Sequence, residues 1–359
     1  MKLSITVLTL FLFGMTAFAQ DSSTALEKGV YAYIYTSKGK IITFLEYENV
    51  PMTVSNFVGL AEGTIDNAAF GLGRPYYTNS KWHRVIPEHV IQGGSPDIKG
   101  RAGTGYSYPN EIYDGLSHGK PGVLGIANAG PHTNGSQFYI TLGDRSYLDG
   151  NYSLFGYVVE GMDVVYAIDQ NDIIERIEIK RIGRKAERFR PVTRSFKKMV
   201  EKANKELAKN ENEKQQLISE YIAANYSQAK SDSNGLVHQV ITEGSGAILS
   251  KGSSVKIIYT GMVLLDDLAF VSTADAGKPL NDNIATSFDY EIGTLKINKG
   301  LDLMIQQMKL GEKRVVIVPP AMGYGRNGFY GPYKPSNQRF VINPGVTLLY
   351  EIEMTAVNN

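Results

Sequence analysis

Two stretches of the sequence concentrate the side chains that could do chemistry. The first, Trp82-His83-Arg84-Val85-Ile86-Pro87, leads to Val90-Ile91-Gln92-Gly93-Gly94. The second, Gly125-Ile126-Ala127-Asn128-Ala129-Gly130-Pro131, runs into Thr133-Asn134-Gly135-Ser136-Gln137-Phe138. Both set a few amide side chains and one guanidinium among apolar and small residues. Such a group offers hydrogen bonds and a fixed positive charge rather than a nucleophile.

Composition excludes several other chemistries. The chain has no cysteine, which excludes disulfides, thiol catalysis, zinc–thiolate sites and a lipid-modified cysteine. No histidines stand at H-x-x-x-H spacing, so we interpret His83, His118 and His132 as structural and expect no metal and no cofactor. Gly103-Thr104-Gly105 lacks the lysine and helix of a phosphate loop and predicts a turn. A net charge of +1 argues against nucleic acid as the partner.

The N-terminus has the pattern of a signal peptide. Met1-Lys2 gives a basic start, Ile5 to Phe13 is almost wholly apolar, and Ala17-Phe18-Ala19 supplies small residues for cleavage. We therefore expect a signal peptide over 1–19 and export to the periplasm of a Gram-negative bacterium, or secretion. The alternative is a buried N-terminal strand. No apolar run reaches the roughly 20 residues of a membrane span.

A length of 359 residues predicts two domains. Val30 to Glu46 predicts a β-hairpin, and Pro51 to Ala61 predicts a helix with apolar residues at i, i+3, i+4 and i+7. From Tyr76 to Ile182, short apolar runs alternate with glycine, proline and asparagine. We expect these runs to form a closed antiparallel β-barrel with capping helices.

The composition then changes. Residues 184–214 hold 11 Lys/Arg against 5 Asp/Glu, and Phe196, Met199, Val200, Ala203 and Leu207 keep helical spacing. Polar Lys209 to Gln216 could be a break, after which Leu217, Ile218, Tyr221 and Ile222 continue the stripe. We predict a helical connector over 184–234. Its apolar stripe could dock on either domain or pair with a second copy, as a homodimer.

From Gly235 onward the pattern is again that of strands. They are predicted at Val237 to Ile241, Val255 to Leu264, Phe288 to Ile292, Arg314 to Val318 and Thr347 to Val357. One helix, Lys299 to Lys309, interrupts them. We expect an α+β domain over 235–359, an antiparallel sheet around one helix.

The two polar stretches closely resemble the signature segments of the cyclophilins, over about Val30 to Gly183. The resemblance implies a peptidyl-prolyl cis/trans isomerase domain over 30–183. That reaction fits the residue types, because twisting an Xaa-Pro amide breaks its resonance and frees a lone pair on nitrogen. A guanidinium that donates to this nitrogen acts selectively on the twisted state.

The resemblance implies a role for each site residue. Arg84 would be the catalytic donor, and Gln92 and Asn128 would hold the peptide backbone. The substrate-binding residues would be His89, Val90, Ala127, Gln137, Tyr139, Tyr147, Leu148 and Tyr152. His89 and Val90 replace the family's phenylalanine and methionine, Tyr139 replaces a second phenylalanine, Tyr147 stands where tryptophan is common, and Tyr152 where many members have histidine. His89 predicts lower but real turnover, and Tyr147 predicts weak binding of ciclosporin-type inhibitors.

The second domain resembles the FKBP family. The matching segments are Val255 to Gly261, Phe288 to Gly293, Lys299 to Leu301, Met308 to Glu312, Pro319 to Gly325 and Leu348 to Ile352. By resemblance, a proline cup would be formed by Tyr259, Phe270, Phe288, Ile297, Leu301, Tyr324, Val341, Ile342 and Tyr350. Val271 stands where the family has aspartate, and Leu301 where it has the tryptophan of the cup floor. The same aromatic residues could instead be plain core.

Two functions remain open from the sequence. In the first, the protein is an isomerase that assists the folding of exported proline-containing polypeptides, with catalysis mainly through Arg84. In the second, it is a holdase chaperone or assembly factor whose proline pockets mainly bind.

Overall fold

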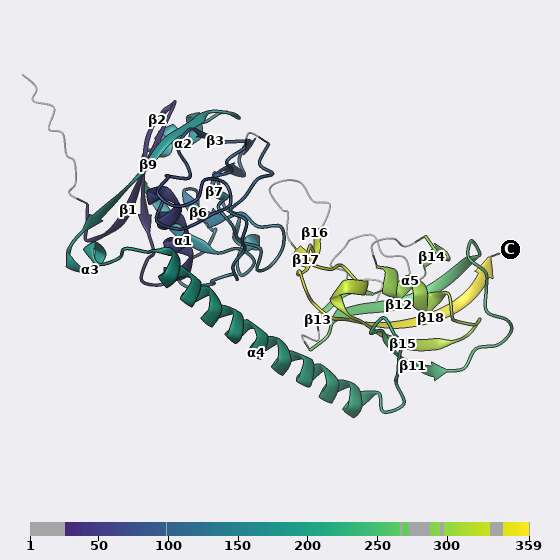
Figure 1. The fold of residues 1–359 in the computed structure, drawn as a ribbon. Coiled ribbons are helices and arrows are strands. Elements are labelled where there is room, and N and C mark those ends of the chain that lie inside the picture. The colour runs from purple at the N-terminus through teal and green to yellow at the C-terminus, as the bar shows by residue number, and fades with distance from the viewer. Residues whose placement is uncertain are drawn as a thin grey trace, which may run out of the picture.

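The protein is described by a computed structural model over residues 26–97, 99–265, 268–272, 288–294, 298–330 and 340–358. Of 268–272, 288, 330, 340, 341 and 358, only the backbone is described. Two sheets lie at opposite ends of one long helix (Figure 1). The expected signal peptide lies outside the described residues. Among the helices that are described, none combines the length and apolar character needed to cross a membrane.

The first sheet has nine antiparallel strands in the order β3-β9-β1-β2-β8-β6-β7-β5-β4. Their bounds are β1 Gly29–Thr36, β2 Gly39–Leu45, β3 Ser80–Lys81, β4 Arg84–Ile86, β5 Val90–Gly93, β6 Val123–Ile126, β7 Phe138–Thr141, β8 Leu154–Glu160 and β9 Ile173–Ile182.

The prediction of a closed barrel is wrong, because the sheet is curled but open at its ends. Strands β3 and β4 do not pair within the described residues. Trp82, between them, instead donates its backbone N–H to the carbonyl of Asp172 and accepts from the N–H of Asn171. These bonds continue the pairing of β3 with β9, while β4 pairs with β5, and among the described residues an isolated bridge joins Lys81 to Ser95.

Helix α1 (Pro51–Glu62) fills the concave side of this sheet. Every residue from Met52 to Ala61 is buried. Proline stands at the first turn, where no N–H is needed, and Gly63 ends the helix at φ 72°. A Cβ at Gly63 would lie 2.7 Å from the backbone of Arg74, so this end requires glycine. The remaining short helices of the domain are η1 (Ser146–Leu148), α2 (Met162–Ala167) and α3 (Arg184–Glu187).

The connector helix α4 (Thr193–Asn225) runs without interruption through 209–216, where the sequence had left a break open. Its N-terminal part packs Phe196 and Met199 against the first core. Its C-terminal part packs Ile218 and Tyr221 against the second sheet. The stripe therefore docks on both domains of its own chain.

The second sheet is antiparallel, with the order β10-β11-β15-β18-β12-β13 and β14 paired to β12. Its strands are β10 Lys230–Ser231, β11 Val237–Thr242, β12 Ser254–Val263, β13 Leu268–Ser272, β14 Phe288–Glu291, β15 Lys313–Val318 and β18 Leu348–Asn358, and a separate hairpin joins β16 Phe329–Tyr330 to β17 Phe340–Ile342. The turn η2 covers Pro320–Met322.

Helix α5 (Lys299–Ile305) lies on this sheet and is shorter than the predicted Lys299 to Lys309. It stops early because the N–H of Met308 bonds to the carbonyl of Ile305, which tightens the chain into turns before Gly311. Met308 remains fully buried, so the apolar spacing of the sequence reflects core packing beyond the end of the helix.

Candidate active site

The predicted catalytic arginine lies on an edge strand, beside the residues predicted to hold a peptide. Arg84 is paired directly with Gln92 across β4 and β5, and Gln92 with Tyr139 across β5 and β7. The exposed Arg84 guanidinium donates to Oε1 of Gln92 at 3.1 Å. Gln92 donates to Oε1 of Gln137 at 2.9 Å, and Gln137 donates to the carbonyl of Gly100 at 2.8 Å. This relay fixes the orientation of both amides.

A cavity of about 830 Å³, including the solvent at its mouth, lies beside this relay. Its lining consists of Arg84, His89, Val90, Gln92, Ala127, Asn128, Tyr139, Leu148 and Tyr152. The structure thus brings together nine of the eleven residues predicted for the first site. Gln137 lines an adjoining groove of about 1020 Å³, which shares Gln92, Ala127 and Asn128 with the cavity. Tyr147 lies on η1, half-buried, and is outside the lining of both.

Asn128 is held by the loop that follows it. Its Oδ1 accepts from the N–H of Gly130 at 3.2 Å, and its Nδ2 lies 3.4 Å from both the Oδ1 of Asn134 and the carbonyl of Asn151. Asn134 is itself fully buried and donates to the Tyr108 carbonyl. Asn134 also forms an isolated β-bridge with Tyr108, so this bridge braces the loop of the site.

His89 is held by an arginine that the sequence did not single out. Arg145 donates from Nε to Nδ1 of His89 at 2.8 Å, and its Nη2 donates to the carbonyl of Glu88. Burial, together with the nearby charges of Arg145 and Arg84, lowers the pKa of His89 to about 4. The ring is therefore neutral at pH 7, and because Nδ1 accepts, its hydrogen is on Nε2. No sequence motif marked Arg145, and only its burial, 7% exposed, reveals its role.

The described members of the second predicted site gather in one apolar cluster. Leu301, Ile342 and Tyr350 are buried, and Tyr259 and Tyr324 are half-buried beside them. The rings of Tyr259 and Tyr350 lie 6.3 Å apart between centroids. The side chains of Phe270, Phe288 and Val341, and all of Ile297, lie outside the described residues.

Asn298 anchors this cluster and was missed by the sequence interpretation. Its Oδ1 accepts from the N–H of Leu301 at 3.1 Å, which caps α5, and its Nδ2 donates to the Tyr350 hydroxyl at 2.7 Å. Tyr350 is 1% exposed and Leu301 5%, so both belong to the core. Tyr259 and Tyr324 are the members with surface left to meet a ligand.

The rims of the two sites approach each other. A Cβ at Gly130, two residues beyond Asn128, would lie 3.0 Å from the Cβ of Arg326, two residues beyond Tyr324. Helix α4 docks on both domains and so supports this approach.

Comparison with known proteins identifies two matching families. The model of the cyclophilin type peptidyl-prolyl cis-trans isomerases matches residues 31–184, and that of the FKBP-type peptidyl-prolyl cis-trans isomerases matches 246–355. The chain is 44% identical over 145 residues to the probable peptidyl-prolyl cis-trans isomerase A of Mycobacterium bovis, covering 39% of this chain and 80% of that one.

Two further comparisons also cover less than half of this chain. Identity to the peptidyl-prolyl cis-trans isomerase ppi1 of Schizosaccharomyces pombe is 44% over 134 residues, 36% of this chain and 79% of that one. A crystal structure of a Cryptosporidium parvum cyclophilin type isomerase aligns with a TM-score of 0.38 and 28% identity, over 44% of this chain and 100% of that one.

Proposed function

Because this chain belongs to the cyclophilin-type peptidyl-prolyl cis-trans isomerases and carries an FKBP-type domain as well, we propose that Arg84 performs most of its turnover. The protein is a peptidyl-prolyl cis/trans isomerase that assists folding.

Arg84 has the geometry that the reaction needs. The uncatalysed Xaa-Pro bond faces a barrier of about 18–20 kcal/mol, and the twisted state exposes a lone pair on the proline nitrogen. Arg84 is held at the mouth of the cavity by its bond to Gln92, so a donor is already in place when the lone pair develops. Gln92 and Asn128 hold the flanking peptide, and Val90, Leu148 and Tyr139 surround the proline ring.

His89 places a polar ring where apolar contact with the bound proline is expected. With Nδ1 bonded to Arg145, the remaining ring N–H is on Nε2 and can donate to a substrate carbonyl. That contact would hold substrate and twisted state about equally, so it would strengthen binding more than turnover. We therefore propose a real but reduced turnover, and weak binding of ciclosporin-type inhibitors because of Tyr147.

We propose that the second domain binds proline-containing chains. Isomerisation by this domain is the equal alternative. Tyr259 and Tyr324 present half-buried rings above a floor closed by Leu301 and Tyr350. Leu301 fills less space than an aromatic ring and gives a looser floor. The alternative for the whole chain, a holdase chaperone or assembly factor, is supported by this binding surface and by the approach of Gly130 to Arg326.

We further propose that residues 1–19 direct export, to the periplasm or out of the cell. The support is the sequence pattern of Lys2, the apolar run Ile5 to Phe13 and the small residues at 17–19. Detection of a mature protein beginning at Gln20 in the periplasmic or culture fraction would support export, and an uncleaved cytoplasmic chain would contradict it.

The deciding experiment compares isomerase activity with aggregation control in the mature full chain. Arg84→Ala should lose most turnover on an Ala-Pro peptide. If the variant still suppresses aggregation of an unfolded client, the two roles lie on different surfaces. Full retention of turnover would contradict the assignment to Arg84.

A further inference from the structure

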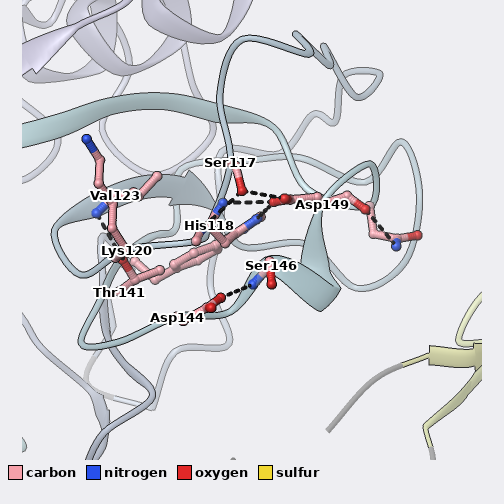
Figure 2. A network of polar contacts seen from close by, with 11 residues as sticks. Ser117, His118, Lys120, Val123, Thr141, Asp144, Ser146 and Asp149 are labelled. Carbon is pink, nitrogen blue, oxygen red and sulfur yellow. Dashed lines mark hydrogen bonds and ion pairs between the residues drawn. The ribbon is translucent and has the colours of Figure 1, made fainter. Parts of the chain in front are cut away.

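Beneath the proline pocket, two polar side chains that the steps above leave unused, Asp149 and His118, are hydrogen-bonded in series to Tyr139 of the pocket wall. His118 Nδ1 lies 2.6 Å from Asp149 Oδ1, and His118 Nε2 lies 2.6 Å from the Tyr139 hydroxyl. Figure 2 shows His118 and Ser117 both directed at Asp149. His118 is fully buried, and Tyr139 lines the pocket cavity. These hydrogen bonds thus connect the pocket wall to a carboxylate that is partly exposed.

The partners determine which nitrogen of His118 carries the hydrogen. The Asp149 carboxylate accepts from the His118 backbone N–H at 2.8 Å and from the Ser117 hydroxyl at 2.6 Å. Because a carboxylate only accepts, the hydrogen of neutral His118 is on Nδ1. Nε2 is then an acceptor, and the Tyr139 hydroxyl must donate to it. The hydroxyl hydrogen of the pocket wall is therefore directed away from the proline ring.

The sheet leaves room for this hydroxyl at one glycine. Gly125 is the direct partner of Tyr139 across β6 and β7, and a Cβ there would lie 2.3 Å from the Tyr139 hydroxyl oxygen. The rings of His118 and Tyr139 are joined end to end by their hydrogen bond, with centroids 5.9 Å apart and planes at 12°. The His118 ring is also in edge contact with Tyr152, another pocket residue, with centroids 6.3 Å apart. The space at Gly125 and the hydrogen bond to His118 together hold the Tyr139 hydroxyl in one position.

We propose that Asp149 and His118 are positioning residues that keep the Tyr139 hydroxyl turned away from the bound proline, so that turnover requires the neutral form of His118. This inference rests on the proposed role of the cavity as the proline pocket. In this inference the His118–Asp149 pair affects the substrate through Tyr139.

The surroundings of His118 favour its neutral form. Burial lowers its pKa, and the hydrogen bond and charge of Asp149 oppose part of that effect. The other groups near the ring are Tyr139, Tyr152 and His89, and the backbone N–H of Arg145 bonds to the His118 carbonyl. On acidification the proton enters at Nε2, which then donates to Tyr139, and the hydroxyl hydrogen must find another acceptor beside the pocket.

The test is the pH profile of isomerisation in the mature full chain, measured by exchange NMR on an Ala-Pro peptide without titratable groups. The Arg84→Ala background measures any contribution of the second domain, which is subtracted. We expect kcat/KM to fall about three- to tenfold as His118 protonates, at a pH below 6.5, because the Tyr139 hydroxyl then loses His118 Nε2 as its acceptor. Tyr139→Phe has no hydroxyl to redirect and should lose this inflection. Histidine ¹⁵N shifts should show the hydrogen of His118 on Nδ1 at pH 8.

A matched control separates His118 from the other pocket histidine. His89→Gln keeps an acceptor for Arg145 but cannot titrate, and it should retain the inflection. His118→Phe should lower kcat/KM at pH 8 in the native background and much less when Tyr139→Phe is also present. An unchanged inflection in Tyr139→Phe, or a hydrogen on Nε2, would overturn the inference. If the native protein lacked activity at pH 8, the assignment of the cavity as the proline pocket would be wrong. The ¹⁵N shifts would still test the hydrogen bonds of His118 to Asp149 and Tyr139.

Discussion

Arg84 and Gln92 face each other across the β4–β5 ladder and are joined by a hydrogen bond of 3.1 Å from the guanidinium to the amide oxygen. Gln92 is held in turn by Gln137, so the arginine is attached to a fixed amide and not to a mobile carboxylate. An amide carries no net charge, which leaves the full positive charge of Arg84 for the substrate. The hydrogen bond to Gln92 thus orients the Arg84 guanidinium without neutralising its charge.

Arg84→Ala should lower kcat/KM of the first domain by about a hundredfold or more, the usual effect of removing one donor to a transition state. Arg84→Lys should recover only part of it, since an ammonium lacks the planar fork that bonds Gln92. Because Arg84 is exposed, its loss should change the free energy of unfolding by no more than about 0.5 kcal/mol. Exchange NMR and thermal melting measure the two quantities, and a variant that loses both together would point to a folding defect.

His89→Phe should raise turnover and lower stability at once. A phenyl ring gives the proline apolar contact, but it leaves Arg145, 7% exposed, without the acceptor for its Nε. An unsatisfied buried donor costs about 1–3 kcal/mol. His89→Gln is the matched control, because it restores an acceptor and should recover stability without the gain in turnover. A phenylalanine variant as stable as the native chain would show that the Arg145 bond contributes little.

Much of the first site was predictable, because the resemblance of the two polar stretches to the cyclophilins indicated which residues share the cavity. Arg84, Gln92 and Asn128 meet there as the sequence indicated. Arg145 and the His118–Asp149 pair were not recognised, since lone polar residues in loops carry no periodic signal. Their partners are 56 and 31 residues away along the chain, and only the folded sheet brings them together.

The errors in the fold have local causes. A closed barrel was expected from the alternation of short apolar runs, but this pattern does not show which strands pair at the ends of the sheet, where β3 pairs with β9 and β4 with β5. The length of α5 was overestimated because Met308 is buried at helical spacing in a turn. The sequence did not predict that α4 docks on both domains, because an apolar stripe on a helix does not specify which surface it packs against.

Stability should fall as the pH is lowered from 7 to 4. Burial lowers the pKa of all five histidines, His83, His89, His118, His132 and His238, relative to their ordinary value. The unfolded chain therefore binds more protons than the folded one once the pH drops below about 6.5, and the free energy of unfolding decreases. Urea titrations at pH 7, 6 and 5 should give successively lower midpoints. A constant midpoint over this range would contradict the assignment of neutral histidines.

Helix α4 packs against both domains. Ile218 on α4 is 7% exposed and packs with Val315, Ile317 and Leu349 of the second sheet, whereas its neighbour Leu217 is 54% exposed. Ile218→Ala should cost about 2–5 kcal/mol of docking energy because it opens a cavity at this contact. Leu217→Ala should cost almost nothing, and it is a matched control on the same helical turn.

Small-angle scattering would report the consequence for the arrangement of the domains. If α4 holds the second domain in place, Ile218→Ala should broaden the distribution of interdomain distances, while Leu217→Ala leaves it as in the native chain. The fluorescence of Trp82, in the first core, should remain unchanged in both variants, because that core packs on the other end of α4 through Phe196. Equal scattering from the two variants would mean that Ile218 does not fix the second domain, and that the approach of Gly130 to Arg326 is maintained by other contacts.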